Sequence, residues 1–200
     1  MGFATILDII GSMIIGGILM MIAWRLSDAS TEKTYNYSGE LVLQQNLKTV
    51  VEIIEYDFRK IGYCDVPGSL PDAVIVYADA NRIDFYTDLQ PLNGVANIDL
   101  LHYYLGPTSE CSETPNPRDR ILYRVENNET PKPSNLGITQ FRLVYMDALG
   151  DTLFSPVADP SLIKTIEINV AVENVAAYDT LYSEAIWRQI RMASRNISAR

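Results

Sequence analysis

The N-terminal part of the chain is almost entirely apolar. Residues 9–24 carry no charge, and residues 1–24 carry only that of Asp8. A helix of this length, at 1.5 Å per residue, spans about 36 Å and can cross a hydrocarbon core of about 30 Å. The pattern therefore predicts an apolar transmembrane or assembly helix over residues 1–26. A cleaved secretory signal fits less well, because no basic residue precedes the apolar run and no A-x-A site follows it.

The helical pattern continues through residues 27–62 without a proline. Lys48 with Glu52, and Glu55 with Arg59, are spaced i,i+4 and are expected to pair on the exposed side. Gly62 is the predicted C-cap. Apolar residues at three- and four-residue spacing predict a face that packs on a sheet. They are Leu43, Leu47, Val50, Val51, Ile54, Phe58 and Ile61.

The remaining residues, 63–200, alternate between short apolar runs and turn-rich segments, which predicts an antiparallel β-rich head. The expected strands are 73–78, 82–87, 99–105, 121–126, 138–146, 164–173 and 181–192. In 164–173, apolar residues alternate with polar or small ones, so one face is expected to meet solvent. The predicted fold class is therefore α+β, with a long N-terminal helix, apolar and then amphipathic, packed on an antiparallel sheet.

Two predicted loops, residues 106–120 and 127–137, are long and rich in Pro, Ser, Thr and Asn. They are either plain connections or contact surfaces, because loops on a rigid scaffold often carry contacts.

Charge and cysteine content limit the function classes. The net charge of −9 argues against nucleic-acid binding, which needs clustered Lys and Arg. The chain has two cysteines and one histidine, His102, too few for a zinc site, and we expect no metal. If the head lies outside the cytoplasm, Cys64 and Cys111 are candidates for a disulfide. The alternative is that both are unpaired small apolar residues of the core.

Motifs that carry catalysis are missing from the sequence. It contains no GxSxG, no Gly-rich phosphate loop and no HExxH. His102 stands in an apolar strand pattern between Leu101 and Tyr103, which favours a packed or surface histidine over a catalytic one. We therefore expect no catalytic residue, no cofactor and no enzyme activity.

Asp8 and the glycines are the unusual residues of the apolar segment. A carboxylate inside a bilayer is costly and needs a partner or an interfacial position. Asp8 therefore either lies at the membrane surface, where the helix N-terminus favours an anion, or pairs with a positive charge of another chain. Gly16 and Gly17 either allow close helix packing or weaken the helix locally.

Together these features resemble the type IV pilin superfamily. Gly2 and Phe3 stand at the position of the Gly–Phe processing site, an apolar helix with an acid near its start follows, and 12–19 is similar to the glycine-bearing midsection of pilin helices. The head segment 55–63 (EYDFRKIGY) resembles the end of the long helix in W-type minor pilins and J-type minor pseudopilins. Segments 78–85, 122–125 and 141–150 are similar to later parts of the same group.

The resemblance implies a structural subunit of a type IV pilus-like filament or of a type II secretion pseudopilus. A prepilin peptidase would cut after Gly2 and free the Phe3 amine for N-methylation. The subunit would wait in the inner membrane with its head outside the cytoplasm, and then pack with other pilin-like subunits through its helix. Asp8 would neutralise a neighbour's amine, although the family has Glu there, one residue nearer Phe3.

A second hypothesis keeps the membrane helix without the filament. In it, the chain is a membrane-anchored extracytoplasmic binding domain that does not polymerise. Processing at Gly2 and Phe3, and self-association through the helix, distinguish the two hypotheses.

Overall fold

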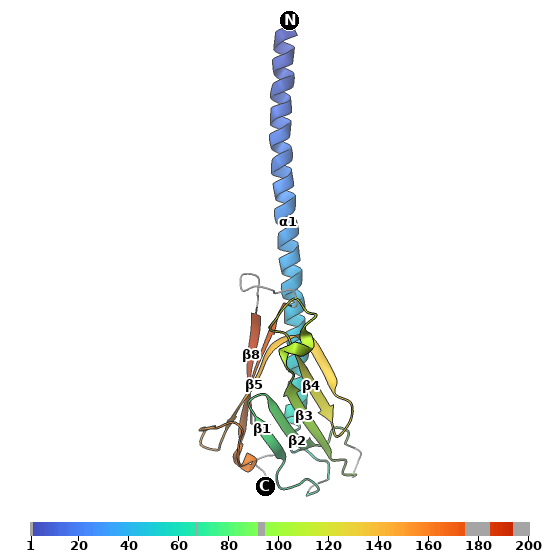
Figure 1. Ribbon diagram of the computed structural model, residues 1–200, viewed down its shortest axis with the longest axis vertical. Helices are drawn as coiled ribbons and strands as arrows, with labels where there is room; N and C mark the ends of the chain where they lie inside the picture. The colour runs from blue at the N-terminus through green and yellow to red at the C-terminus, as the bar shows by residue number, and fades with distance from the viewer. Residues whose placement is uncertain (1, 67, 92–94, 175–184, 194–200) are drawn as a thin grey trace. The chain divides into compact units, whose positions relative to one another are not determined.

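The computed structural model describes residues 2–66, 68–91, 95–174 and 185–193. Its one long helix, α1, runs from Gly2 to Arg59 (Figure 1). Eight strands follow: β1 (Ile75–Asp79), β2 (Arg82–Thr87), β3 (Asp99–Leu105), β4 (Arg120–Glu126), β5 (Lys132–Met146), β6 (Thr152–Leu153), β7 (Thr165–Glu173) and β8 (Ala185–Ala193). Two short 3₁₀ helices, η1 (Thr108–Cys111) and η2 (Pro160–Leu162), lie between strands. The described residues thus form an α+β fold.

The chain divides into two compact units, Met1–Val42 and Leu43–Arg200. The first unit is helix, and none of its described side chains, those of residues 6–35 and 37–42, is buried. The second unit contains the last part of α1 and the whole sheet, and we call it the head.

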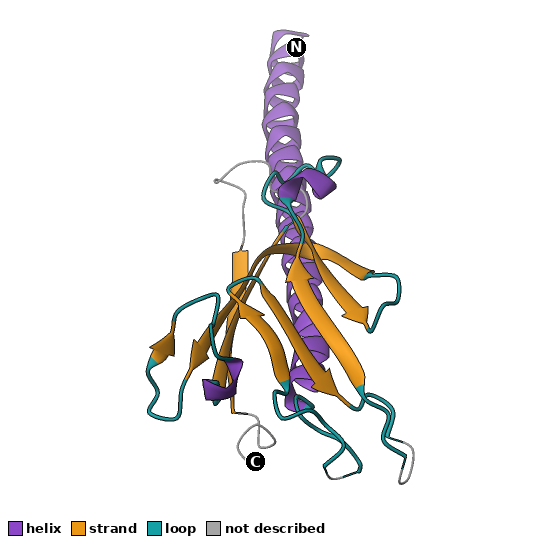
Figure 2. Cartoon of the chain, turned by 60° about the horizontal axis from the view of Figure 1, so that its bottom comes forward, coloured by secondary structure: helices purple, strands orange, loops and turns teal. Residues whose placement is uncertain are grey.

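The last part of α1 forms the centre of the core of the head. All seven residues predicted for the packing face, from Leu43 to Ile61, are buried. Phe58 packs edge-on against Phe85 of β2 and Tyr103 of β3, with both ring-centroid distances at 5.5 Å. The predicted amphipathic face is therefore confirmed, and it covers the inner face of the sheet (Figure 2).

All described strand pairs are antiparallel, in the order β1-β2-β3-β4-β5-β7-β8, with β6 paired to β5. The long strand β5 pairs with two strands. Its first part pairs with β4, and its second part, from Ile138, pairs with β7. The change occurs at Gly137, whose φ is +73° and which lies against the carbonyl of Glu173. Glycine adopts this left-handed backbone without steric cost.

The turn between β1 and β2 contacts β5, so the sheet curls back on itself. The amide of Leu143 donates to the carbonyl of Ala80 at 2.8 Å. The hydroxyl of Tyr145 donates to the carbonyl of Asp79 at 2.9 Å. These bonds satisfy backbone groups that an open sheet would leave unpaired.

Several predicted boundaries differ from the structure. The helix ends at Arg59 rather than at residue 62, and Gly62 has a φ of +72°. Residues 132–137, predicted as part of a loop, belong to β5, because the bend at Gly137 lets them pair with β4. Within the predicted strand 181–192, residues 181–184 lie outside the described residues.

Candidate functional site

The first candidate site is the exposed apolar part of α1. Large apolar side chains between Ile6 and Leu26 are each at least half exposed, among them Met13 at 77% and Leu26 at 70%. The helix is long and apolar enough to cross a membrane by length and composition, a test that a signal sequence also passes. Side chains exposed all round a helix need a lipid or protein environment, because water solvates them poorly.

The predicted assembly residues lie along this helix. Gly2 is its first residue, and the side chain of Phe3 lies outside the described residues. The side chain of Asp8 is exposed. A Cβ atom added at Gly16 or Gly17 meets nothing within 4 Å, so both positions are open for contacts with another molecule. Peptidase cleavage and the pairing of Asp8 remain predictions.

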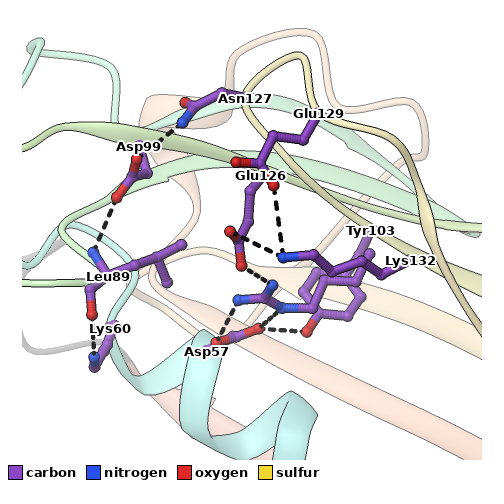
Figure 3. Close-up of polar contacts among 10 residues, drawn as sticks. Asp57, Lys60, Leu89, Asp99, Tyr103, Glu126, Asn127, Glu129 and Lys132 are labelled. Atoms are coloured by element: carbon purple, nitrogen blue, oxygen red, sulfur yellow. Dashed lines mark hydrogen bonds and ion pairs between the residues drawn. The ribbon is translucent and has the colours of Figure 1, made fainter.

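The second candidate site is a polar cluster between the end of α1 and the sheet (Figure 3). Its members, which we call the Asp57 cluster, are Asp57, Tyr103, Arg124, Glu126 and Lys132. The buried carboxylate of Asp57 accepts from the Tyr103 hydroxyl at 2.5 Å and from Nε of Arg124 at 2.5 Å. Arg124 also pairs with Glu126, whose other oxygen lies 3.2 Å from Nζ of Lys132. The cluster thus links the helix to strands β3, β4 and β5.

Burial and pairing set the protonation of this cluster. Burial, together with the charge of Asp57, raises the pKa of Tyr103 far above its ordinary value of 10.0. Burial alone would lower the pKa of Arg124, but hydrogen bonds to Asp57 and Glu126 outweigh it and raise that pKa. The guanidinium of Arg124 lowers the pKa of Glu126. Tyr103 is therefore a neutral donor, and Arg124 and Glu126 form an ion pair.

A hollow of about 300 Å³ lies beside the Asp57 cluster. Its walls are mostly apolar and include Ile53 and Ile54 of α1, Leu122 of β4 and Pro133 of β5. Arg124 and Lys132 form part of its polar rim, and their charges are already paired within the cluster. The cluster therefore stabilises the helix–sheet contact, and its charged groups are bound to one another.

The proposed disulfide is absent from the described structure: Cys64 and Cys111 are both free thiols. Cys64 follows the end of α1, near the end of β2, where the amide of Asp88 donates to the carbonyl of Tyr63. Cys111 ends η1, which begins shortly after the other end of β3. The seven residues of β3, about 20 Å of extended chain, separate the two regions, whereas a disulfide needs Cα atoms within about 7 Å.

The loop of residues 106–120 is anchored to the sheet rather than free. Arg118 donates to Glu173 of β7 at 2.7 Å, and the buried Asn116 donates to the same carboxylate at 3.1 Å.

His102, predicted to be a packed or surface residue, is partly buried, and its Nδ1 lies 3.0 Å from Asp84. Tyr104 of β3 and Tyr123 of β4 are paired in register, and their rings stack with centroids 4.9 Å apart.

The comparisons with known proteins give no match. Neither protein-family models, nor curated proteins, nor solved structures match this chain. Any functional conclusion therefore depends on the residues and geometry of the chain itself.

The Asp57 cluster is not predicted from the sequence pattern, although Asp57 itself carries one signal of it. Asp57 lies three residues after Ile54 and directly before Phe58, on the apolar face of the helix. Because a charge on a buried face must be paired, such a residue indicates a buried partner. The identity of that partner, Arg124, depends on strand pairing 67 residues away.

Proposed function

We propose that this protein is a structural subunit of a type IV pilus-like filament or a type II secretion pseudopilus. The subunit is held in the inner membrane by the apolar part of α1, with its head outside the cytoplasm. It leaves the membrane when the same helix packs with the helices of other pilin-like subunits.

One observation carries this proposal. A single helix, α1, has exposed apolar side chains along its first part and supplies the core of an antiparallel sheet with its last part. An anchor and a folded head that share one continuous helix can pass from lipid to a helical bundle without refolding. In both environments the apolar side chains leave water, which is the driving force for each state.

The residues of the first turns have defined roles in this proposal. Cleavage after Gly2 would create a positive amine on Phe3. The exposed carboxylate of Asp8 would neutralise the amine of a neighbouring subunit inside the apolar filament core, where an unpaired charge is costly. Gly16 and Gly17 would allow neighbouring helices to approach closely.

The test is the intact mass and N-terminal residue of the protein recovered from native membranes or filaments. A chain that begins at an N-methylated Phe3 supports the proposal, because only pilin-type processing produces that terminus. A chain that still begins at Met1 contradicts it. Gly11→Ala, a glycine change elsewhere on the helix with open space around it, is the control for a Gly2→Ala variant, which should remain uncleaved after residue 2.

A membrane-anchored binding domain that does not polymerise is the second candidate. The observation that favours it is a polar groove on the outer face of the sheet, on strands β5 and β7. Self-association separates the candidates: native cross-linking of the anchored protein yields ladders of higher oligomers for a subunit and monomers for an isolated binding domain.

A further inference from the structure

The outer face of the sheet carries a groove of about 460 Å³ that the assembly mechanism does not use. Strands β5 and β7 line it with both polar and apolar side chains. The polar ones are Gln140, Arg142, Glu167 and Asn169, and the others are Val144, Val170 and Ala171. The volume lies in the range of small-ligand sites, about 300–1,000 Å³.

One side of the groove contains the carboxylate of Glu167, which accepts hydrogen bonds from neighbouring side chains. Glu167 is buried on the outer face, although the alternation of its strand predicted a solvated position. Arg191 of β8 pairs with it at 2.9 Å and Asn169 donates to it at 3.4 Å. The hydrogen bond from Arg191, with smaller contributions from Gln189 and Asn169, lowers the pKa of Glu167. The carboxylate thus fixes the amide of Asn169 within the groove.

The charge of Arg142 is not neutralised by any residue that the structure describes. This side chain is exposed, and no hydrogen bond or ion pair reaches it from the described residues, whereas Arg118, Arg124 and Arg191 are each paired. Arg142 is paired in register with Asn169, which is paired in turn with Gln189. A guanidinium and two amide residues therefore follow one another across three strands.

These positions favour a sugar over a peptide. Strand β7 is paired on both sides, with β5 and β8, so its backbone groups are already used. An extended peptide gains its main-chain bonds at a free sheet edge, which this groove does not offer. Side-chain amides act as both donors and acceptors, as do the hydroxyl groups of sugars. A guanidinium adds charge-assisted hydrogen bonds to a carboxylate.

We propose that the groove on β5 and β7 binds a carboxylate-bearing oligosaccharide, with its carboxylate on Arg142 and its hydroxyl groups on Asn169 and Gln140. This inference does not rest on the proposed filament. A subunit with this groove would bind acidic glycans whether or not it assembles.

The test is isothermal titration calorimetry of the full chain in detergent micelles. The acidic probes are the trimers of galacturonate and of mannuronate, and sialyllactose. Maltotriose is the neutral probe, and a hexamer of glutamate is the acidic peptide probe. The variants are Arg142→Gln and Asn169→Ala. Arg59→Gln, an exposed arginine change on α1, is the matched control.

The expected result is that at least one acidic trisaccharide binds with a Kd below about 1 mM and maltotriose binds at least about tenfold more weakly. Arg142→Gln and Asn169→Ala should each raise the Kd of the acidic trisaccharide by about tenfold or more, and Arg59→Gln should leave that Kd unchanged. The far-ultraviolet circular dichroism of each variant shows that the sheet is intact.

Three results would overturn the inference. The first is that none of the acidic trisaccharides binds. The second is that one binds without dependence on Arg142. The third is that the glutamate hexamer binds as tightly as the sugars with the same dependence on Arg142, which would identify an acidic peptide as the occupant. None of these results bears on processing at Gly2, so the proposed filament role is tested separately.

Discussion

The hydroxyl of Tyr103 donates a 2.5 Å hydrogen bond to the carboxylate of Asp57, a residue 46 positions earlier in the chain. Arg124 reaches the same carboxylate from the next strand, at 2.5 Å. One buried acid on α1 thus holds two neighbouring strands, β3 and β4. The position of the helix on the sheet depends on this polar contact as well as on apolar packing.

Replacing the buried acid should strongly destabilise the head. In Asp57→Asn, the positive charge of Arg124 loses its main partner while remaining largely buried. Breaking one partner of such a pair costs about 3–5 kcal/mol. Urea unfolding of the full chain in micelles, followed by circular dichroism, should show this loss in the free energy of unfolding. Asp72→Asn, at an exposed acid, should change it by less than about 0.5 kcal/mol. Equal stability of both variants would contradict this role for Asp57.

The bend of β5 should not tolerate a side chain. In Gly137→Ala, the new Cβ would lie 2.4 Å from the carbonyl oxygen of Glu173, at a φ of +73°. Backbone strain of about 1–3 kcal/mol and overpacking of about 1–3 kcal/mol should add, and the melting temperature should fall accordingly. Gly150→Ala is the control, since it has a φ of +90° but open space. It should lose only about 1–2 kcal/mol. A smaller loss at Gly137 than at Gly150 would exclude the contact with Glu173 as the cause.

The stability of the head should fall in alkaline solution. Burial raises the pKa of both Tyr103 and Tyr145 above the ordinary value of 10.0. Each phenol therefore stabilises the fold fully below about pH 10, where both states keep the proton. Above that pH the unfolded chain loses protons that the folded chain keeps, so the free energy of unfolding decreases as pH rises.

Tyrosine variants test whether Tyr103 causes this loss of stability at alkaline pH. Tyr103→Phe should reduce the fall in unfolding free energy between about pH 8 and about pH 11, because one linked proton is removed. Tyr37→Phe, at an exposed tyrosine, should leave the fall unchanged. Urea titrations at several pH values measure how the free energy of unfolding changes with pH. An identical slope in wild type and Tyr103→Phe would show that this phenol ionises normally in the folded chain.

The two cysteines should react as free thiols with different rates. Cys64 is half-buried, whereas Cys111 is buried, and burial and the charges of Asp119 and Glu110 raise its pKa. The thiolate is the reactive form, so alkylation of native protein should label Cys64 first and Cys111 much more slowly. Mass spectrometry without reductant should find two labels after unfolding, and Cys64→Ser should leave the slow label alone. A protein that takes up no label until it is reduced would indicate a disulfide.

Removal of the N-terminal acid should impair assembly and leave the head folded. Asp8→Ala removes the only charge of residues 1–24, so a neighbour's amine would stay unpaired in the filament core. Immunoblotting of sheared filaments should show much less of the variant than of wild type at equal membrane levels. Asp28→Ala, at another exposed acid of α1, is the matched control. Normal incorporation of Asp8→Ala would show that assembly does not need this carboxylate.

Local pattern predicted the elements of the fold well. The apolar face of the helix, the two i,i+4 ion pairs and the runs of β2, β3 and β7 all follow from spacing over a few residues. Periodicity identifies which side of an element is buried, because side chains repeat every 3.6 residues in a helix and every two in a strand.

The departures from prediction all involve partners distant in the sequence. The first part of β5 has the sequence of a loop, and it forms a strand because β4 pairs with it before the bend at Gly137. Glu167 is buried on a face expected to meet solvent, because Arg191 of β8 neutralises it. The free state of Cys64 and Cys111 likewise depends on which end of β3 each one lies near.

Hydrophobic pattern alone is enough to predict a long helix with an apolar first part and an amphipathic last part, followed by an antiparallel head. These properties depend on hydrophobic periodicity, which acts between residues close in the chain. The folded structure is needed to show that Asp57 contacts Tyr103 and Arg124, that β5 bends between β4 and β7, and that Arg142 in the outer groove has no ion-pair partner among the described residues. Each of these depends on strand register, which brings residues tens of positions apart within hydrogen-bonding distance.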